Sequence, residues 1–352
     1  MPGGNPLETA QVVFDEVPDL PFLGELPGRG PGADMIGRTA ALLVDIPVEV
    51  TPGGWRIADR PGRDMRRAKS MLSSDLDAME EILDGYQGPL KLQLAGPWTL
   101  AATIEQPHSL KVALADPGLV NDIASSLAEG ARLHVAEVAK RVPGATLLVQ
   151  LDEPSLPAVA HGGIPTPSGL SRVREVDEEV LRAKLREVLE ATRAYTVVHC
   201  CASGYPFEII NGAGADAVSF DLSLLGHGDY DTFAETVEGG SGLLIGALSV
   251  TGLGQDSARP SARGPVSAHP AGESSASRRS DVERSRPTPE GTANAVREVW
   301  RKIGLSPASC AEQVVITPAC GLAGASPDRA RDALRWCREA GRILPELMAE
   351  LT

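Results

Sequence analysis

Short apolar runs recur along this chain, and each one ends at a glycine, a proline or a polar residue. No other feature of the sequence limits the fold as strongly. Apolar runs of four to eight residues that do not alternate with polar ones are typical of strands buried on both faces. The runs cover residues 41–48, 91–96, 146–154, 195–200, 217–223, 242–250 and 313–321.

Amphipathic helical patterns lie between most of these runs. The clearest ones occupy residues 73–86, 120–142, 176–194 and 326–351. Strands that alternate with helices form parallel βαβ units. Seven such strands in 352 residues predict an α/β fold, a (β/α)8 TIM-type barrel rather than a doubly wound open sheet. The eighth strand is not visible in the pattern.

One segment, residues 254–291, interrupts the barrel pattern. It contains no Leu, Ile, Met or aromatic residue and is rich in Ser, Pro, Gly and Arg. Such a composition buries too little apolar surface to offset the entropy lost on ordering. Because a helical pattern resumes at residues 294–305, we predict one barrel domain over 1–352 with a disordered inserted loop at 254–291.

The charge balance and the N-terminus bear on partners and location. A net charge of −14 argues against nucleic acid as a partner, because phosphate binding needs clustered Lys and Arg. No segment has the pattern of a signal peptide or the length of apolar sequence that spans a membrane. We therefore expect a cytoplasmic protein with a small-molecule partner and no membrane association.

A histidine and two cysteines carry donors suited to a metal. His199 and Cys201 form an H-x-C pair at the end of one predicted strand, and Cys320 follows another. Asp221 ends a strand between them, and parallel barrels collect such strand ends on one rim. Imidazole, thiolates and a carboxylate are a natural zinc set. The alternative is that these cysteines simply pack as small apolar residues.

Two further stretches end strands with candidate site residues. Asp152 and Glu153 follow one strand, so at least one acid should face the rim, although a helix-capping acid is the alternative. Trp98 follows a Gly-Pro turn and either lines a pocket or belongs to turn chemistry alone. Packing or surface roles are expected for the remaining thiols and imidazoles: Cys200, Cys310 and Cys337, and His108, His134, His161, His227 and His269.

Several common catalytic motifs are absent from the sequence. There is no phosphate-binding loop, no Gly-rich dinucleotide fingerprint after a strand and no G-x-S-x-G nucleophile turn. These absences remove the corresponding phosphate, dinucleotide and serine-hydrolase readings.

Five motifs in the same order give a family resemblance. "LAGPWTL", "LDEPSL", "VVHCC", "SFDLS" and "ITPACGL" together resemble the C-terminal catalytic barrel of cobalamin-independent methionine synthase, most closely its short single-barrel members. The resemblance covers nearly the whole chain apart from the inserted loop. It implies a barrel of the type shared with uroporphyrinogen decarboxylase.

The resemblance also implies roles for particular residues. It implies a zinc ion held by four residues: His199, Cys201, Asp221 and Cys320. It implies that Asp152 holds the amino group of homocysteine, with Glu153 and Trp98 nearby as further substrate contacts. The methyl donor would be methyl-tetrahydrofolate or a methylcorrinoid, either methylcobalamin or a corrinoid protein.

The sequence departs from the family pattern at several positions. Asp221 stands where the family has Glu, and the first strand is reduced to residues 1–3. A start codon chosen too far downstream would explain this and predicts that the natural chain continues upstream; otherwise the barrel lacks a strand. The pterin-binding Trp and Glu are matched by Thr103 and Ala158, which places folate binding in doubt. The family's proton-transferring His, which follows the strand at 242–250, has no match.

The sequence therefore predicts a zinc-dependent methyltransferase that converts homocysteine to methionine. Three alternatives stay open. One is a related zinc enzyme that alkylates a different thiol, and another is a metal-free decarboxylase of the uroporphyrinogen type. The third is a barrel whose zinc is structural and which has no catalytic role.

Overall fold

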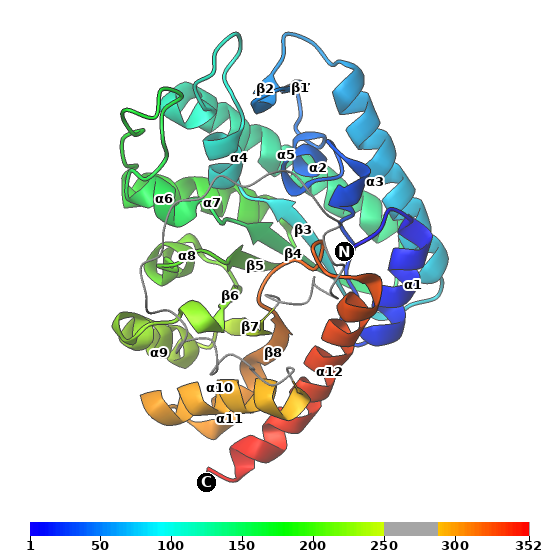
Figure 1. The fold of residues 1–352 in the computed structure, drawn as a ribbon, viewed down its shortest axis with the longest axis vertical. Coiled ribbons are helices and arrows are strands. Elements are labelled where there is room, and N and C mark those ends of the chain that lie inside the picture. Colours follow the sequence, from blue (N-terminus) through cyan, green and yellow to red (C-terminus); the bar gives the residue numbers. More distant parts are fainter. Residues whose placement is uncertain (250–287, 352) are drawn as a thin grey trace, which may run out of the picture.

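Six parallel strands form the centre of the fold (Figure 1). The computed structural model describes residues 1–249 and 288–351. The strands pair in sequence order, each parallel to the next. They are β3 (Gly88–Ala95), β4 (Ala145–Asp152), β5 (Tyr195–Cys200), β6 (Ala217–Asp221), β7 (Gly242–Leu248) and β8 (Val314–Pro318).

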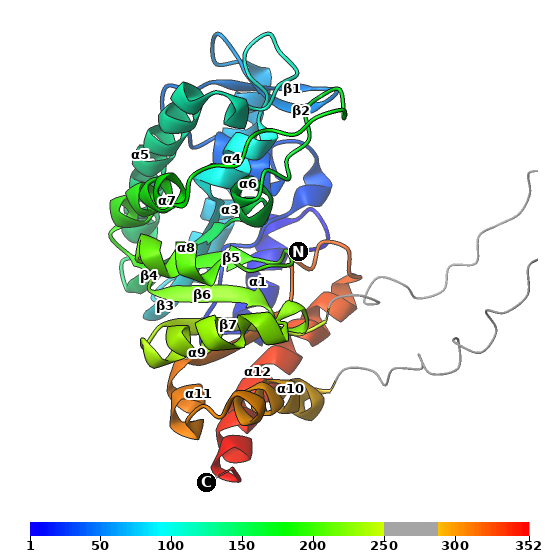
Figure 2. The ribbon, with the colours of Figure 1, turned by 90° about the vertical axis from the view of Figure 1, so that its left-hand side faces the viewer.

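Helices connect the strands and surround the sheet. Figures 1 and 2 show them around the outer side of the strands, as in the wall of an α/β barrel. The longer ones are α3 (Arg63–Ile82), α5 (Pro117–Arg141), α7 (Glu178–Thr192), α10 (Pro289–Ile303) and α12 (Pro327–Ala349). The shorter ones are α1 (Pro6–Glu16), α2 (Met35–Ala40), α4 (Pro97–Thr103), α6 (Leu156–Ala160), α8 (Phe207–Ala213), α9 (Tyr230–Glu238) and α11 (Pro307–Gln313).

The predicted barrel class is thus confirmed for these six strands. Side chains alternate between the two faces of each strand. On β3, Leu90 and Leu92 are fully buried against the helix layer, where they contact residues of α3 and α5. The intervening Lys91 faces the concave side of the sheet, where it hydrogen-bonds a side chain of β4. No helix in the described parts of the chain is both long and apolar enough to cross a membrane.

The segment at residues 21–23 takes the place of a short strand beside β3. Phe22 forms a parallel bridge with Lys91, through hydrogen bonds from Leu23 N to Lys91 O (3.0 Å) and from Lys91 N to Pro21 O (2.9 Å). Within the described residues, no strand lies between this segment and β8, and residues 1–3 form none. Over residues 1–249 and 288–351 the barrel is therefore open at the position where the sequence predicts a reduced first strand.

The predicted strand at residues 41–48 is wrong. Only Val48 belongs to a strand, and that strand, β1 (Val48–Thr51), pairs antiparallel with β2 (Gly54–Ile57) in a hairpin outside the sheet. Ala41 and Leu43 are buried without any strand partner. Asp45 has a φ of 59°, which a strand cannot contain. The run is apolar because it packs, not because it pairs.

The predicted loop at 254–291 falls almost entirely outside the described residues. Over 254–287 it therefore stays a prediction. Its last four residues belong to the next element, since Thr288 caps α10 by accepting a hydrogen bond from Gly291 N, 3.1 Å from its Oγ1. α10 thus begins at Pro289, before the helical pattern that the sequence shows from residue 294.

Candidate metal and substrate site

The carboxyl ends of β4, β5 and β6 bring the first candidate residues onto one face. His199 on β5 is in register with Asp152 on β4 and with Ser219 on β6. Because alternate residues of a strand share a face, Cys201 and Asp221 extend the same row beyond His199 and Ser219. The H-x-C spacing thus puts the imidazole and the second thiol on the concave side. Cys200, between them, is buried on the opposite side, as expected.

Cys201 and Cys320 meet across the concave face. Their sulfur atoms lie 3.8 Å apart although 119 positions separate them in sequence. Cys201 follows β5 and Cys320 follows β8, with β6 and β7 between them. Three strand spacings in a flat sheet would separate them by about 14 Å. The curl of the sheet is what joins these two thiols.

The two thiols influence each other's ionisation. Both are free, and Cys320 is exposed whereas Cys201 is half-buried. Their hydrogen bond lowers the pKa of Cys320 to about 6 and raises that of Cys201, because the remaining proton is shared with the thiolate that forms first. The pair therefore loses its first proton more easily than an isolated thiol does, which suits binding of a cation.

His199 is neutral and held in place by a serine. Its Nδ1 lies 2.9 Å from Ser219 Oγ. Burial, and then the positive charge of Lys91, lowers the pKa of His199 to about 4. A neutral imidazole whose Nδ1 is hydrogen-bonded keeps Nε2 for a ligand, which is the usual state of a metal-binding histidine.

Asp221 has a local structural contact. Its Oδ1 accepts hydrogen bonds from Ser223 N (2.9 Å) and Ser223 Oγ (2.7 Å), which cap the turn at Leu222–Leu224. The cap fixes the carboxylate on β6. Its second oxygen takes no part in the cap.

The donor set fits zinc in part. Among the described residues, no group of three or more His, Cys, Asp or Glu side chains is gathered closely enough to hold a metal ion. The two thiols alone fit well, because sulfurs bound at about 2.3 Å to one tetrahedral zinc are about 3.8 Å apart, the separation that they have here. The other two predicted ligands, His199 and Asp221, lie on the neighbouring strands β5 and β6 and are not gathered with this pair.

Asp152 is the acid that faces the concave side. Its Oδ1 accepts a hydrogen bond from Gln150 Nε2 at 2.7 Å, and its side chain is only 8% exposed. Burial raises the pKa of Asp152 to about 6, while the charge of Lys91 and the hydrogen bond from Gln150 oppose that rise. At neutral pH it is an anion in a poorly solvated place, which favours binding of a cationic group.

Glu153 and Trp98 have structural contacts instead. Glu153 is 0% exposed, and its two oxygens accept hydrogen bonds from Trp98 N (2.9 Å), Thr99 N (2.7 Å) and Thr99 Oγ1 (2.7 Å). It therefore caps α4, the alternative that the sequence left open. Trp98 is fully buried and its indole N–H donates to Leu181 O. The substrate site proposed below is built without either residue.

Two polar residues of the concave face were missed by sequence reasoning. Lys91 begins the apolar run 91–96 and Gln150 interrupts the run 146–154, but the run pattern by itself assigns them only to strands. A polar side chain that alternates with buried leucines was the available signal. His134 was expected at the surface, but it is buried on α5 with 4% exposed.

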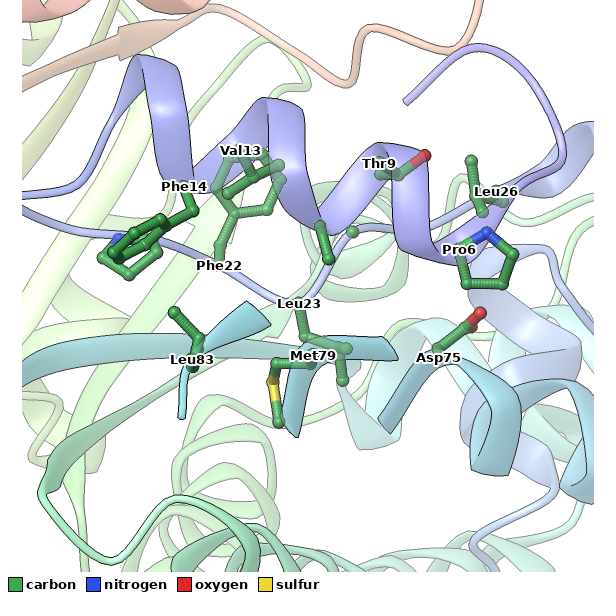
Figure 3. A pocket seen from close by; sticks show the side chains of 13 residues that line it. Pro6, Thr9, Val13, Phe14, Phe22, Leu23, Leu26, Asp75, Met79 and Leu83 are labelled. Carbon is green, nitrogen blue, oxygen red and sulfur yellow. The ribbon is translucent and has the colours of Figure 1, made fainter. Parts of the chain in front are cut away.

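A small cavity lies between α1, residues 21–26 and α3 (Figure 3). Its volume of about 20 Å³ is room for little more than one water molecule. Asp75 is the acidic group at its wall, and its Oδ2 is 2.7 Å from Arg29 Nη2. None of the predicted site residues lines this cavity.

Comparison with known proteins gives a likeness to solved structures but not to a family model or a curated protein. No family model matches the chain, and no curated protein matches it. Among solved structures, the chain is similar to a B12-independent methionine synthase from Shewanella sp. W3-18-1 in complex with selenomethionine. The two share 16% identity over 78% of this chain and 67% of that one, with a TM-score of 0.48. A likeness this distant carries no argument about function.

Proposed function

We propose that this protein is a zinc-dependent methyltransferase that transfers a methyl group to the thiol of homocysteine and forms methionine. The proposal rests on the residues at the carboxyl ends of the strands and on the five ordered sequence motifs. It makes His199, Cys201, Asp221 and Cys320 the zinc ligands, and Asp152 the partner of the substrate amino group.

The observation that carries the proposal is the contact between Cys201 and Cys320. Two thiols from strands that are not neighbours lie 3.8 Å apart on the concave face. Pure packing does not explain the pair, because Cys320 is exposed. The separation is that of two ligands of one tetrahedral zinc ion.

A bound zinc ion would hold the substrate thiol as a thiolate at neutral pH, where a free thiol is mostly protonated and a weak nucleophile. The chain's own contribution is to supply the ligands in the right state. His199 is already neutral, and one proton is already easily lost from the thiol pair.

Asp152 gives the site its preference for an amino acid. A buried carboxylate on the same face would pair with the ammonium group of homocysteine and so fix the direction of its side chain. In the reaction the sulfur forms a bond to the methyl carbon while the bond from that carbon to the donor breaks. The electron pair of the broken bond stays with the donor, which leaves as a reduced corrinoid or, after its nitrogen takes up a proton, as tetrahydrofolate. The thiol proton leaves to solvent.

The donor is methyl-tetrahydrofolate or a methylcorrinoid. The two positions that match the family's pterin contacts are Thr103, which is exposed at the end of α4, and Ala158, which is half-buried on α6. Neither side chain has the ring or the charge that a pterin contact requires. These two positions therefore do not support a pterin, and the test includes both donors to decide between them.

The rival enzyme is a zinc protein of the same type that alkylates another small thiol. Asp152 disfavours this rival, because a thiol without an amino group would offer no donor to Asp152 Oδ2. A barrel with a structural zinc predicts a closed site whose metal does not respond to added thiols. A metal-free decarboxylase predicts no stoichiometric zinc.

The proposal is tested with purified protein by metal analysis and by a methyltransfer assay. Homocysteine is supplied with methylcobalamin or with methyl-tetrahydrofolate, and methionine is measured. We expect about one zinc per chain and methionine from at least one donor. Methionine formed equally well by Cys320→Ser would contradict the zinc mechanism, and methionine from neither donor would favour the structural-zinc alternative.

A further inference from the structure

Lys91, Gln150 and Asp152 form a continuous row of hydrogen bonds on the concave face. Lys91 Nζ donates to Gln150 Oε1 at 3.2 Å, and Gln150 Nε2 donates to Asp152 Oδ1 at 2.7 Å. Gln150 and Asp152 are two residues apart on β4, and Lys91 lies on the neighbouring β3. The row runs from Lys91, in the middle of β3, to Asp152, at the carboxyl end of β4, where the candidate site lies.

The chemistry of the three groups fixes the direction of the row. A lysine ammonium only donates and a carboxylate only accepts, whereas a primary amide does both at opposite ends. Gln150 must therefore present its carbonyl to Lys91 and its amino group to Asp152. This orientation holds the Asp152 carboxylate from one side and leaves its Oδ2 for a ligand.

The place of Lys91 is itself defined by its neighbours. Its Nζ lies 5.6 Å from the centroid of the Phe22 ring, in the segment that stands in for a strand beside β3. Arg38 and Glu25 add opposite charges nearby, and both act on Lys91 as well as on Asp152. Among the described residues, however, only Gln150 hydrogen-bonds the Asp152 side chain.

We propose that Lys91 is a positioning residue for the amino-acid substrate, and that through Gln150 it holds Asp152 as an oriented anion for the substrate amino group. The inference rests on the proposed function, because it assigns the specificity for an α-amino thiol to a three-residue unit. Lys91 itself does not touch the substrate. The positive charge of Lys91 compensates the buried carboxylate of Asp152. The Gln150 amide, which Lys91 holds, fixes the orientation of that carboxylate.

The experiment compares two thiols in the zinc-loaded protein. Homocysteine carries the amino group, and 4-mercaptobutanoate is the same thiol acid without it. In Lys91→Met we expect the KM for homocysteine to rise about 10- to 100-fold with kcat within about threefold, because a binding contact is weakened and the chemistry is not. The KM for 4-mercaptobutanoate should stay unchanged.

Three further variants separate positioning from a merely structural role. Gln150→Leu breaks the row at its centre and should reproduce the KM effect of Lys91→Met. Adding Lys91→Met to Asp152→Asn should cost nothing more, since the unit is already disabled. Lys140→Met is the matched control, because Lys140 is exposed on α5 and should change neither KM.

The outcomes distinguish this inference from the proposed function. A wild-type protein that makes no methionine with either donor overturns the function and the inference together. A wild-type protein that is active, with Lys91→Met unchanged in KM, overturns the inference alone. Equal losses for the two thiols, or a further loss in the double variant, would show that Lys91 only supports the fold.

Discussion

The two faces of the sheet at the ends of β4 and β5 carry nearly the same residue types. On the concave face lie Asp152 and Cys201, and on the helix-facing side their chain neighbours Glu153 and Cys200. Both acids are buried, and burial raises the pKa of each, to about 6 for Asp152 and to about 7 for Glu153. Their partners, however, differ completely.

On the helix-facing side the polar atoms are satisfied by the fold itself. Glu153 receives three hydrogen bonds from the first turn of α4. On the concave face Asp152 receives one, and Cys201 meets another thiol from across the sheet. The comparison teaches that neither residue type nor burial identifies a site. A site is identified instead by groups that can still bind a partner after the contacts of the fold have been made.

The largest expected effect comes from removing one thiol of the pair. Cys320→Ser should lose bound zinc and reduce methionine formation by about 10³-fold, more than the 10- to 100-fold that changes around a metal ligand cause. Metal analysis and the methyltransfer assay measure both. The unfolding transition of the zinc-free variant should match that of zinc-free wild type, because Cys320 is exposed.

Cys200→Ala is the matched control on the other face. It should keep its zinc and its turnover, and lose about 1 kcal/mol of unfolding free energy through a small cavity. Zinc loss in Cys200→Ala comparable to that in Cys320→Ser would remove the distinction between the faces.

The second effect separates the two acids. Glu153→Ala leaves three donors at the buried start of α4 without their acceptor, so the unfolding free energy should fall by about 3 kcal/mol. Its KM for homocysteine, measured where the variant is folded, should stay that of wild type. Asp152→Asn should do the reverse, with a raised KM and a stability change within about 1 kcal/mol. Denaturant unfolding and steady-state kinetics on both variants decide.

The third prediction concerns the buried histidine of the helix layer. Burial, together with the charge of Arg38, lowers the pKa of His134 to about 3. The unfolded chain takes up a proton near pH 6.5 and the folded chain does not, so stability falls as the pH drops from 6.5 towards 3. At pH 5 this amounts to about 2 kcal/mol.

His134→Gln should therefore lose about 2 kcal/mol less than wild type between pH 7.5 and pH 5 in denaturant unfolding. Any contribution from His199 is common to both proteins and cancels in the difference. His227→Gln, at an exposed position, is the control and should follow wild type. Parallel curves for His134→Gln and wild type would mean that His134 takes up its proton in the folded state.

The sequence predicted the barrel because burial on both faces leaves a direct trace in composition. Each of the six parallel strands overlaps one of the apolar runs, although β3 begins three residues and β4 one residue before its run. Residues 41–48 are equally apolar but do not pair with the parallel sheet, since packing alone also selects apolar residues. The four proposed ligands were placed by motif order, but which of them meet depends on the curl of the sheet. For the same reason the face of Glu153, and the row from Lys91 to Asp152, could not be predicted from local sequence.

The smallest expected effect distinguishes the serine that contacts His199 from the serine that contacts Asp221. Ser219 Oγ contacts His199 Nδ1 at 2.9 Å and is the only hydroxyl that orients the ring among the described residues. Ser223 Oγ contacts Asp221, but the Ser223 backbone N–H binds the same oxygen and would remain in an alanine variant. Ser219→Ala should therefore weaken zinc binding about 10-fold, whereas Ser223→Ala should weaken it less than about threefold. Competition with a chromophoric chelator measures both affinities. Equal affinities in the two variants would mean that His199 is not held for a metal by Ser219, and the face would then owe its zinc to the thiol pair and Asp221 alone.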